Sequence, residues 1–490
     1  EERYEVVAAV AGTELAGITY EPLFDWVEPD SPAHRVIIGD FVSLGDGTGI
    51  VHVAPAYGAE DLEVGRAEGL PIIHTVQLDG NVSEFPGVAQ SGVNFKAADP
   101  GITEDLRSRG LLYRSGTVEH TYPFCWRCES PLIYRAVSSW FVKVESIKES
   151  MLLSNQQIGW VPEHIQDGRF GKWLEAARDW CISRDRYWGT PLPIWRNEDT
   201  GESICVGSLE ELEGLCGRSI PDLHKHYVDD IEIPAPSGEG VLKRIPSVLD
   251  CWFESGSMPY AQNHYPFENR QFFDDNFPVD FISEGLDQTR GWFYTLLAVS
   301  TTAFDSLCYK RCLSLGLILD KEGKKMSKSK GNVVDPWDHF NREGADATRW
   351  YMVTAGAPWN PLKFNPSGVR ETYAKMFLTL WNVYRFHADY AALDEFNPDA
   401  SDCPVASRSG LDRWLLSRIG AISQEYHDQF VGWDFHKACR DLEDFVVNDL
   451  SNWYVRRSRR RLWDDAESAD KLACQHTLHE ALLQVCRLMA

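Results

Sequence analysis

Four lysines and two serines stand together at residues 324–330, and Gly331 and Asn332 follow them directly. Such a polar segment cannot lie in a core, so it predicts a surface loop. Its ammonium groups suit a polyphosphate, because cationic donors stabilise the negative charge that builds up as a phosphate group leaves. A solvated basic loop is the alternative, and it is the commoner origin of lysine clusters.

A second polar group lies upstream of this loop. Glu284, Asp287 and Gln288 follow an apolar run and precede an apolar helical pattern that begins near Trp292. Ligands of open α/β sheets bind at the carboxyl ends of the strands, so we expect these side chains to face a ligand. The alternative is an ordinary acidic helix start, since carboxylates favour that end of a helix.

Strands and helices in alternation would have to position both groups. The apolar run 313–319 predicts a buried strand, and residues 320–323 predict the turn that leaves it. A loop-rich passage at 122–131 leads into this alternation, which extends to about residue 324 and favours a doubly wound sheet.

The two ends of the chain have residue patterns that differ from that of the middle. Residues 1–120 alternate short β-prone runs with Gly and Pro turns around helical patches at 59–68 and 103–108, which predicts a strand-rich α+β domain. From about 369 onward, apolar residues fall three and four positions apart, which favours a helical bundle with a turn at 397–410. The first apolar residues of this kind are Tyr373, Phe377, Leu380, Trp381 and Tyr384.

The composition excludes some classes of function. With 490 residues and a formal net charge of −25, the chain is unsuited to binding nucleic acid by bulk attraction, although a local basic surface is compatible with it. No apolar stretch approaches the roughly 18 residues of a membrane span. Twelve mostly scattered cysteines fit free thiols in a reducing compartment, so we expect a cytoplasmic protein.

The order of residues in the lysine loop is more specific than its charge. Lys325-Met326-Ser327-Lys328-Ser329 matches the signature loop of the class I aminoacyl-tRNA synthetases. Further segments in family order make the chain resemble the isoleucyl-tRNA synthetases, in their archaeal and eukaryotic style. These segments lie at 122–128, 180–189, 250–257, 281–293 and 450–457. The valyl and leucyl relatives share the lysine loop, but 250–257 and 284–293 look isoleucyl.

The resemblance implies an α/β multidomain fold. Its parts would be the remainder of a strand-rich editing (connective peptide) domain at 1–120, the second half of a Rossmann-like catalytic domain with connective insertions at 121–335, a stem-contact linker at 336–368 and a truncated α-helical anticodon-binding bundle at 369–490. The family's His-x-Gly-His ATP motif is not in the sequence. We therefore expect an internal fragment that is inactive alone.

The implied activity is the ATP-dependent ligation of L-isoleucine to tRNA(Ile) through isoleucyl-adenylate, with hydrolytic editing of mischarged valine. ATP would bind with Mg²⁺, and we expect a monomer without a membrane partner. Two alternatives stay open: a non-catalytic tRNA-binding or regulatory relative, and a valyl- or leucyl-tRNA synthetase.

The resemblance also implies roles for single residues. Lys325 and Lys328 would be catalytic, holding the ATP phosphates as charge moves onto pyrophosphate. The ATP-binding loop would comprise Lys325, Met326, Ser327, Lys328 and Ser329. The aminoacyl-adenylate would contact Glu284, Gly285, Asp287, Gln288, Trp252 and Trp292. Indole rings suit an aliphatic substrate because they are broad and apolar, although core packing is the commoner role of tryptophan.

Editing residues are implied in the segment 47–61. An apolar pocket cannot strongly reject a substrate that is one methylene smaller, so such an enzyme needs a hydrolytic site. Asp61 would bind the amino group of the mischarged residue and His52 would limit its size. Tyr57 departs from the histidine common at that position. An ordinary strand histidine and an ordinary helix carboxylate are the alternatives for His52 and Asp61.

Two further groups concern metal and tRNA. Cys125 and Cys128 have the spacing of half a zinc site, and plain buried thiols are an equal alternative. Only Cys205 stands where the family has a second pair, so we expect no second zinc. The arginine run beside Trp453 and Tyr454 favours tRNA contact over a merely solvated helical face. The arginines that we expect to contact tRNA are Arg456, Arg457, Arg459 and Arg460.

Overall fold

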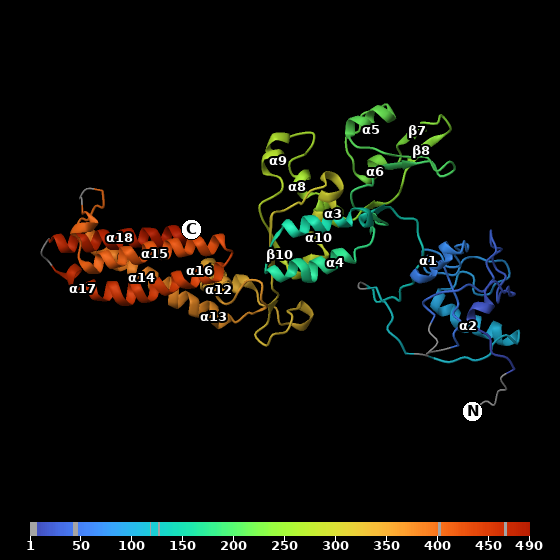
Figure 1. Ribbon diagram of the computed structural model, residues 1–490, viewed down its shortest axis with the longest axis horizontal. Helices are drawn as coiled ribbons and strands as arrows, with labels where there is room; N and C mark the ends of the chain where they lie inside the picture. The colour runs from blue at the N-terminus through green and yellow to red at the C-terminus, as the bar shows by residue number, and fades with distance from the viewer. Residues whose placement is uncertain (1–6, 43–47, 118, 126–127, 400–402, 465–467) are drawn as a thin grey trace. The chain divides into compact units, whose positions relative to one another are not determined.

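The computed structural model describes residues 7–42, 48–117, 119–125, 128–399, 403–464 and 468–490. The chain divides into two compact units, residues 1–139 and residues 140–490. Figure 1 draws the elements of each unit in chain order, from blue to red. None of the helices in the described ranges combines the length and apolar character that crossing a bilayer requires.

Helices are the regular elements of the first unit. The described residues form a 3-10 turn, η1 (Gly12–Leu15), and two helices, α1 (Ala59–Ala67) and α2 (Phe95–Ser108), drawn in blue in Figure 1. The side chain of Asn94 caps α2 by accepting the backbone N–H of Lys96. Both predicted helical patches are confirmed, and α2 begins earlier than its patch.

The predicted strand-rich character of residues 1–120 is wrong for the part that is described. That part holds only isolated bridges, such as those between Thr19 and Arg35 and between Val76 and Val82. Its β-prone runs are short and at least partly exposed; Ile50, for example, exposes 68% of its surface. A strand needs a neighbour for its N–H and C=O groups, and these runs meet no partner strand among the described residues, so they stay irregular.

A parallel sheet organises the second unit. Its strands stand in the order β10 (Ile282–Gly285), β11 (Arg311–Leu315), β2 (Gly159–Val161). Glu284 is paired with Ser314, and Gly285 with Leu315. The parallel order confirms that strands and helices alternate here.

Three helices share a core with this sheet: α3 (Val144–Gln157), α4 (Gly171–Glu175) and α10 (Trp292–Phe304). Figure 1 draws them together beside β10. The connection from β10 to β11 is α10, which is buried from Phe293 to Thr301. Large buried side chains of this core include Met151, Trp160, Phe170, Phe293, Tyr294 and Tyr309.

An insertion with its own core interrupts this alternation. It is an antiparallel sheet in the order β6 (Ser203–Cys205), β5 (Ile194–Arg196), β8 (Val241–Arg244), β7 (Glu232–Pro234), with helices α5 (Leu209–Cys216) and α6 (Lys225–Val228). Trp195, Leu212, Ile233 and Leu242 fill its centre. The chain enters through β4 (Ser183–Arg184) and leaves through β9 (Val248–Leu249), which pair with each other. Another two-residue pair, β1 (Phe141–Val142) and β3 (Trp180–Cys181), adjoins them.

Short helices connect the insertion to β10. They are α7 (Cys251–Gly256), α8 (Met258–Ala261) and α9 (Arg270–Asn276). The side chain of Asp250 caps α7 by accepting the backbone N–H of Trp252.

The predicted strand at 313–319 is split in two. Here β11 ends at Leu315, and β12 (Ile318–Leu319) pairs instead with β13 (Leu362–Lys363). A Cβ at Gly316 would lie 2.2 Å from the backbone oxygen of Asn360, so the chain bends where another segment passes. Leu317 and Ile318 are each 47% exposed, and the strand is therefore not buried throughout.

The predicted turn at 320–323 is confirmed, with Gly323 at φ 84°. The lysine loop follows it and contains one 3-10 turn, η5 (Lys328–Lys330). Two helices then precede β13: α11 (Pro336–Arg342) and α12 (Ala345–Thr354).

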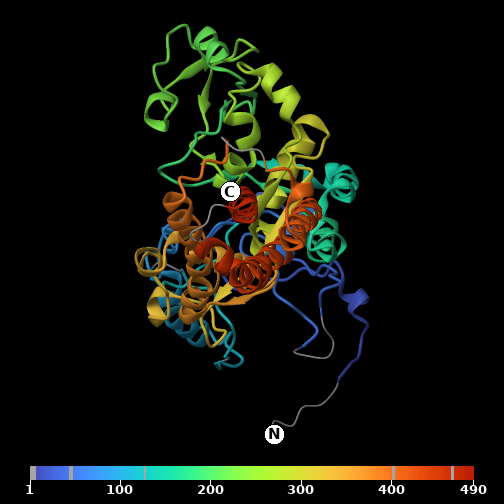
Figure 2. The ribbon, with the colours of Figure 1, turned by 90° about the vertical axis from the view of Figure 1, so that its left-hand side faces the viewer.

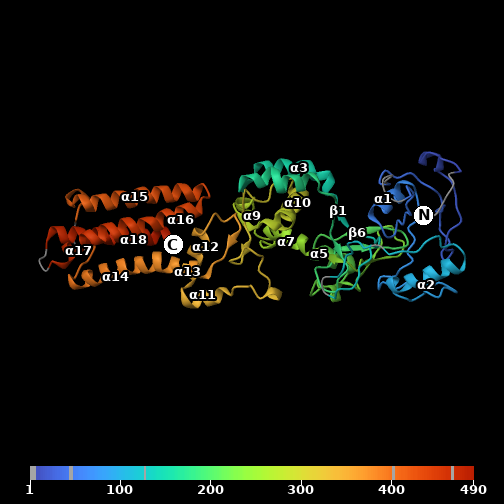
Figure 3. The same ribbon diagram turned by 90° about the horizontal axis from the view of Figure 1, so that it is seen from below.

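The remainder of the chain is helical, as predicted. Its elements are α13 (Pro366–Thr372), η6 (Tyr373–Phe377), α14 (Leu378–Leu393), η7 (Val405–Ser407), α15 (Gly410–Val431), α16 (Phe435–Asp444), η8 (Phe445–Val455), α17 (Arg456–Trp463) and α18 (Ala469–Met489). Figure 3 shows α14, α15 and α18 running side by side, and Figure 2 looks toward their ends. The predicted turn at 397–410 lies between α14 and α15.

The inward face of the first bundle helix differs from the expected aromatic series. Met376, Val383 and His387 are buried there, whereas Trp381 is 58% exposed and Tyr384 is 49% exposed. The π-helical turn η6 precedes α14, and its wider turn rotates the residues after it relative to an ideal helix.

Candidate functional site

The carboxyl edge of the parallel sheet carries the acidic group. Glu284 and Gly285 are the last residues of β10, paired with the last residues of β11. The side chain of Glu284 is exposed. Because ligands of open α/β sheets bind at this edge, Glu284 lies where a ligand would meet the sheet.

Asp287 and Gln288 stand on the turn that follows, η4 (Leu286–Arg290). A Cβ at Gly285 would lie 2.7 Å from Oδ1 of Asp287, so the carboxylate reaches back over the glycine. Gln288 donates to Asp287 over 3.2 Å, and its Oε1 accepts the backbone N–H of Trp292 over 2.9 Å. The structure thus brings four of the predicted residues into one connected group.

Trp252 joins this group through α7. Its ring approaches Gly291, where a Cβ would lie 3.1 Å from the indole, and it remains 40% exposed. The indole N–H of Trp292 donates to the backbone oxygen of Ser255 over 3.1 Å. At Gly256 a Cβ would lie 2.8 Å from the backbone oxygen of Thr295, so α7 packs closely on α10. The two predicted tryptophans therefore flank the same turn.

Asp250 is a residue that sequence reasoning missed. It is 3% exposed, and its Oδ2 accepts Nη2 of Arg184 over 2.6 Å and the indole N–H of Trp180 over 3.2 Å. Its other oxygen caps α7 at Trp252. The signal in the sequence is an Asp directly before a short helix, a position typical of a cap.

The lysine loop presents its cations to solvent. Lys325 and Lys328 are exposed, whereas Met326 packs against the buried cluster of Tyr351, Phe364 and Val369. Met326 therefore anchors the loop. The backbone N–H of Ser327 donates to Asn332, and the side chain of Ser329 lies outside the described ones.

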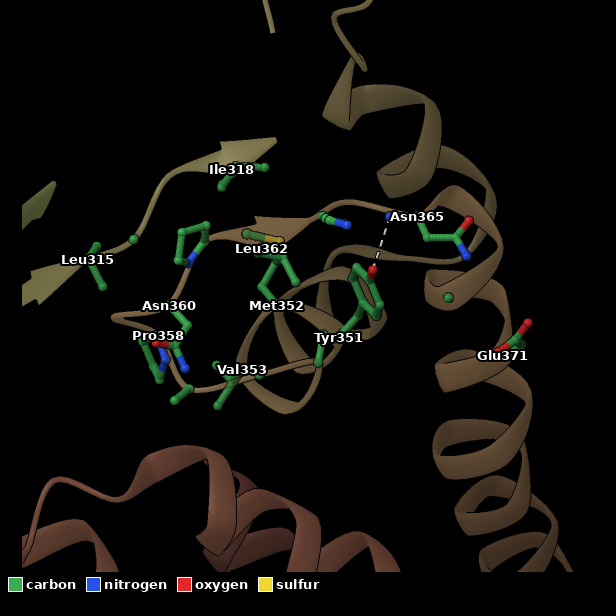
Figure 4. Close-up of a pocket in the computed structure, with 17 residues that line it drawn as sticks. Leu315, Ile318, Tyr351, Met352, Val353, Pro358, Asn360, Leu362, Asn365 and Glu371 are labelled. Carbon is green, nitrogen blue, oxygen red and sulfur yellow. Dashed lines mark hydrogen bonds between the residues drawn. The ribbon is translucent and has the colours of Figure 1, made fainter. Parts of the chain in front are cut away.

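A cavity of about 690 Å³ lies beside the β12–β13 pair, and Figure 4 shows its lining. Tyr351 accepts the backbone N–H of Asn365 at one wall. The described lining includes none of the residues that the sequence predicts for ATP or the adenylate. The cavity adjoins the candidate site through residues such as Leu315, which pairs with Gly285, and Tyr351, against which Met326 packs.

The predicted editing residues lie in the first unit. Oδ2 of Asp61, in the first turn of α1, accepts the backbone N–H of Ala54 over 3.1 Å, which draws the loop bearing the exposed His52 toward α1. The hydroxyl of Tyr57 accepts the backbone N–H groups of Thr75 and Val76. Tyr57 thus has a structural task at the position where it departs from the family pattern.

A bridge between Phe124 and Pro131 encloses the segment that carries Cys125 and Cys128, of which residues 126–127 lie outside the described ranges. Hydrogen bonding with Ser130 lowers the pKa of Cys128 to about 7, which favours the thiolate. Within the described ranges, no three His, Cys, Asp or Glu side chains gather as metal ligands. Two thiolates supply half of a structural zinc site, so no complete zinc site is assigned there.

The arginine run lies on α17, and its members divide into two kinds. Arg456, Arg457, Arg459 and Arg460, the predicted tRNA contacts, are exposed. Arg457 stacks over the ring of Trp453 with 4.7 Å from the guanidinium carbon to the ring centroid. Arg461 instead points inward and donates through both Nη atoms to the buried Asp412.

Comparison with known proteins gives two family matches. Residues 13–360 match the family described as tRNA synthetases class I (I, L, M and V). Residues 412–490 match the anticodon-binding domain of tRNA ligases.

Two relatives are each called isoleucine–tRNA ligase. The Clostridium novyi protein is 47% identical over 494 residues, which cover 100% of this chain and 47% of the relative. The Thermus thermophilus protein is 46% identical over 489 residues, with 99% and 46% covered. The chain thus spans about half the length of these relatives.

Among solved structures, a Mycobacterium tuberculosis methionyl-tRNA synthetase bound by methionyl-adenylate aligns with a TM-score of 0.52. The alignment covers 89% of this chain and 81% of that chain, at 13% sequence identity. At such low identity, the likeness supports the fold alone.

Proposed function

Because the chain belongs to the class I tRNA synthetases, we propose that the protein joins L-isoleucine to tRNA(Ile) with ATP, through an isoleucyl-adenylate. The observation that carries this proposal is the 46–47% identity, over essentially the whole chain, to proteins called isoleucine–tRNA ligase. The intact group at the sheet edge supports catalysis over the alternative of a non-catalytic relative.

In the first step the carboxylate of isoleucine attacks the α-phosphorus of ATP, the bond to the bridging oxygen breaks and pyrophosphate leaves. Lys325 and Lys328 stabilise the charge that moves onto the pyrophosphate. Mg²⁺ accompanies ATP as part of the substrate. Both lysines are exposed on an anchored loop, which suits contact with a polyphosphate.

The adenylate then rests on the group around β10. Glu284, Asp287 and Gln288 accept and donate hydrogen bonds to it, and Gly285 lets its backbone come close. Trp252 and Trp292 flank the aliphatic side chain. The 40% exposure of Trp252 supports this role, because a tryptophan that serves only as core packing would be buried.

In the second step a terminal hydroxyl of the tRNA attacks the adenylate carbonyl, and AMP leaves. The four exposed arginines of α17 contact tRNA phosphates. Their support is exposure in an otherwise acidic chain and the match of residues 412–490 to an anticodon-binding domain.

Editing of mischarged valine is the further activity we propose for the first unit. Asp61 binds the amino group of the mischarged residue and His52 limits its size. The hydrogen bond from Ala54 to Asp61 supports a shared site, because it holds the two segments together. The predicted domain boundaries, the monomeric state and the cytoplasmic location stay predictions.

Isoleucine-dependent exchange of pyrophosphate into ATP tests this function on the protein as its gene encodes it. Exchange with isoleucine well above that with leucine supports the proposal, and valine should follow as a weaker substrate. Exchange that is fastest with valine or leucine would favour the corresponding relative instead. Tight tRNA binding without exchange would favour the non-catalytic alternative.

A further inference from the structure

Two polar side chains close the base of the lysine loop. Asp320 follows β12, and Asn332 lies just beyond η5, twelve positions later in the sequence. Nδ2 of Asn332 donates to Oδ2 of Asp320 over 2.7 Å. Asp320 is 7% exposed and Asn332 is half-buried, so this contact is partly shielded from water. We name the pair the 320–332 clamp.

The clamp holds the backbone of the loop as well as its two ends. Oδ1 of Asp320 accepts the N–H of Lys324 over 2.7 Å. Oδ1 of Asn332 accepts the N–H of Ser327 over 2.9 Å, and its Nδ2 also reaches the oxygen of Lys325 over 3.3 Å. The clamp thus holds Lys324 and Lys325 themselves, and Ser327, which directly precedes Lys328.

The chain can return to Asp320 because η5 ends at Gly331. This glycine has φ 66°, in the left-handed region that side chains disfavour. The turn begins at Ser327, whose N–H is held by Asn332. The same hydrogen bond thus fixes where the turn bearing Lys328 starts.

Charge supports a holding role for Asp320. Hydrogen bonds from the N–H of Lys324 and from Asn332 keep the pKa of Asp320 below its ordinary value, so it is ionised at neutral pH. Both of its oxygens receive N–H donors. The carboxylate is therefore directed at the backbone, while the ammonium groups of Lys325 and Lys328 face outward.

We propose that Asp320 and Asn332 are positioning residues for adenylate formation, which hold Lys325 and Lys328 where they meet the leaving pyrophosphate. This inference rests on the proposed function. Groups that are fixed in advance stabilise a transition state better than mobile ones, because no ordering is needed as charge develops. Neither residue needs to touch ATP for this role.

The test compares pyrophosphate-exchange kinetics of the encoded protein with those of Asn332→Ala. We expect kcat to fall at least about tenfold, the loss that a 1.4 kcal/mol rise of the barrier produces. The KM for isoleucine should change less than twofold, because its pocket lies at β10. Glu322→Gln is the matched control, since Glu322 is an exposed carboxylate in the same turn, and it should leave kcat unchanged.

A reversed pair separates positioning from folding. In the double variant Asp320→Asn with Asn332→Asp, the new amide at position 320 can accept from Lys324 and donate to the new carboxylate at position 332, which can accept from Ser327. The reversed pair should recover part of the kcat that Asn332→Ala loses, since the new carboxylate cannot donate to the oxygen of Lys325. If both variants lose kcat in proportion to their thermal stability, with no rescue, the pair is merely structural and the proposal fails.

Hydrogen exchange of the loop amides gives a readout that does not depend on activity. The N–H groups of Lys324 and Ser327 should be protected in the protein and exchange faster in Asn332→Ala. If the amide hydrogens of Asn332→Ala exchange faster but its kcat for pyrophosphate exchange stays within twofold of the parent, the positioning role is overturned. If the parent shows no isoleucine-dependent pyrophosphate exchange, both the proposed function and the positioning role are refuted. Protection of the loop amides would then still show that the 320–332 clamp forms.

Discussion

The indole N–H of Trp292 donates to the backbone oxygen of Ser255 over 3.1 Å. This bond ties the first residue of α10 to α7, the short helix that carries Trp252. The two tryptophans therefore keep a fixed spacing, and any change that separates the two helices alters the space between the rings. Gly256 lies next to this bond, against the backbone of Thr295.

Gly256→Ala should weaken isoleucine binding. Its new Cβ would meet the backbone oxygen of Thr295 at 2.8 Å, and backbone yields poorly, so α7 must move. We expect a KM for isoleucine about tenfold higher, an unchanged KM for ATP and a loss of about 1–3 kcal/mol of stability. Exchange kinetics and urea unfolding measure these effects. Gly214→Ala is the control: a Cβ there meets open space on α5, so both KM values should stay unchanged. Its stability should not fall but rise by about 0.5–1 kcal/mol, because alanine is the better helix former.

Lys328→Ala should lower the kcat of pyrophosphate exchange by about 10²–10³-fold, the range found when one preorganised donor is removed from a transition state. Affinity for tRNA should stay within twofold in a filter-binding assay. Lys321→Ala removes another exposed lysine, from the preceding turn, and serves as the control. A kcat that survives Lys328→Ala would exclude this lysine from catalysis.

The exposed arginines should act on tRNA through charge. Arg459→Ala with Arg460→Ala should weaken tRNA binding and lower the slope of log affinity against log salt by about 0.7–0.9 for each lost phosphate contact. Arg349→Ala, an exposed arginine of α12 paired with Asp346, should leave the slope unaltered. An unchanged slope in the double variant would show that α17 does not contact phosphates.

Asp412 should be a main support of the bundle. It is fully buried, and burial alone would raise its pKa, but hydrogen bonds from Arg461, Tyr454 and Ser409 outweigh that effect and lower it. Because the folded pKa is depressed, the stabilisation is present above the unfolded pKa of about 3.9 and disappears as the pH falls through the folded value.

Asp412→Asn should therefore destabilise the protein by about 3 kcal/mol at pH 7, since it leaves Arg461 without its buried anionic partner. The difference from the parent should shrink as the pH falls below about 4. Denaturant unfolding at several pH values measures it. A difference that is the same at pH 3 and pH 7 would contradict the assigned ionisation.

His387 should make the bundle sensitive to mild acid. Desolvation by burial, followed by the charge of His479, lowers the pKa of His387 to about 4. The unfolded chain then binds a proton at its ordinary pKa while the folded chain does not, so stability falls as the pH drops from about 6.5 toward 4.

Between pH 7.5 and 5.5, this one group should remove about 1 kcal/mol of stability. His387→Leu should abolish that part of the pH dependence, as measured by unfolding at both values. His427→Leu is the control, because His427 lies on the same bundle in an exposed position. An equal loss of stability in the parent and in His387→Leu would place the acid sensitivity elsewhere.

Local patterns predicted local structure well. The turn at 320–323 and both helical patches of the first unit depend on neighbouring residues, and all are present. The strands predicted within residues 1–120 are absent from the described part of that range, because a strand depends on a partner that no local pattern supplies. The run 313–319 was split by the backbone of Asn360, which is likewise remote in sequence.

The residues of the candidate site likewise fall into those that local motifs indicated and those that depend on remote contacts. The lysines, Glu284 and Asp287 stand in contiguous motifs, so the sequence alone indicated them. The residues that hold those motifs in place were missed, since Asp250 bonds Arg184 across 66 positions and Asp320 bonds Asn332 across 12. Met326 belongs to the lysine-loop motif but packs against a buried cluster, and the order of residues in the motif does not indicate this contact.

The antiparallel insertion enters through Arg184 and leaves opposite it, at Val248. Its two ends are thus already side by side, and its interior is filled by its own side chains. A segment with paired ends and its own core is a self-contained part of the fold. A change in the length or surface of the insertion can therefore leave the spacing of Arg184 and Asp250 unaltered, and with it the start of the helix that carries Trp252.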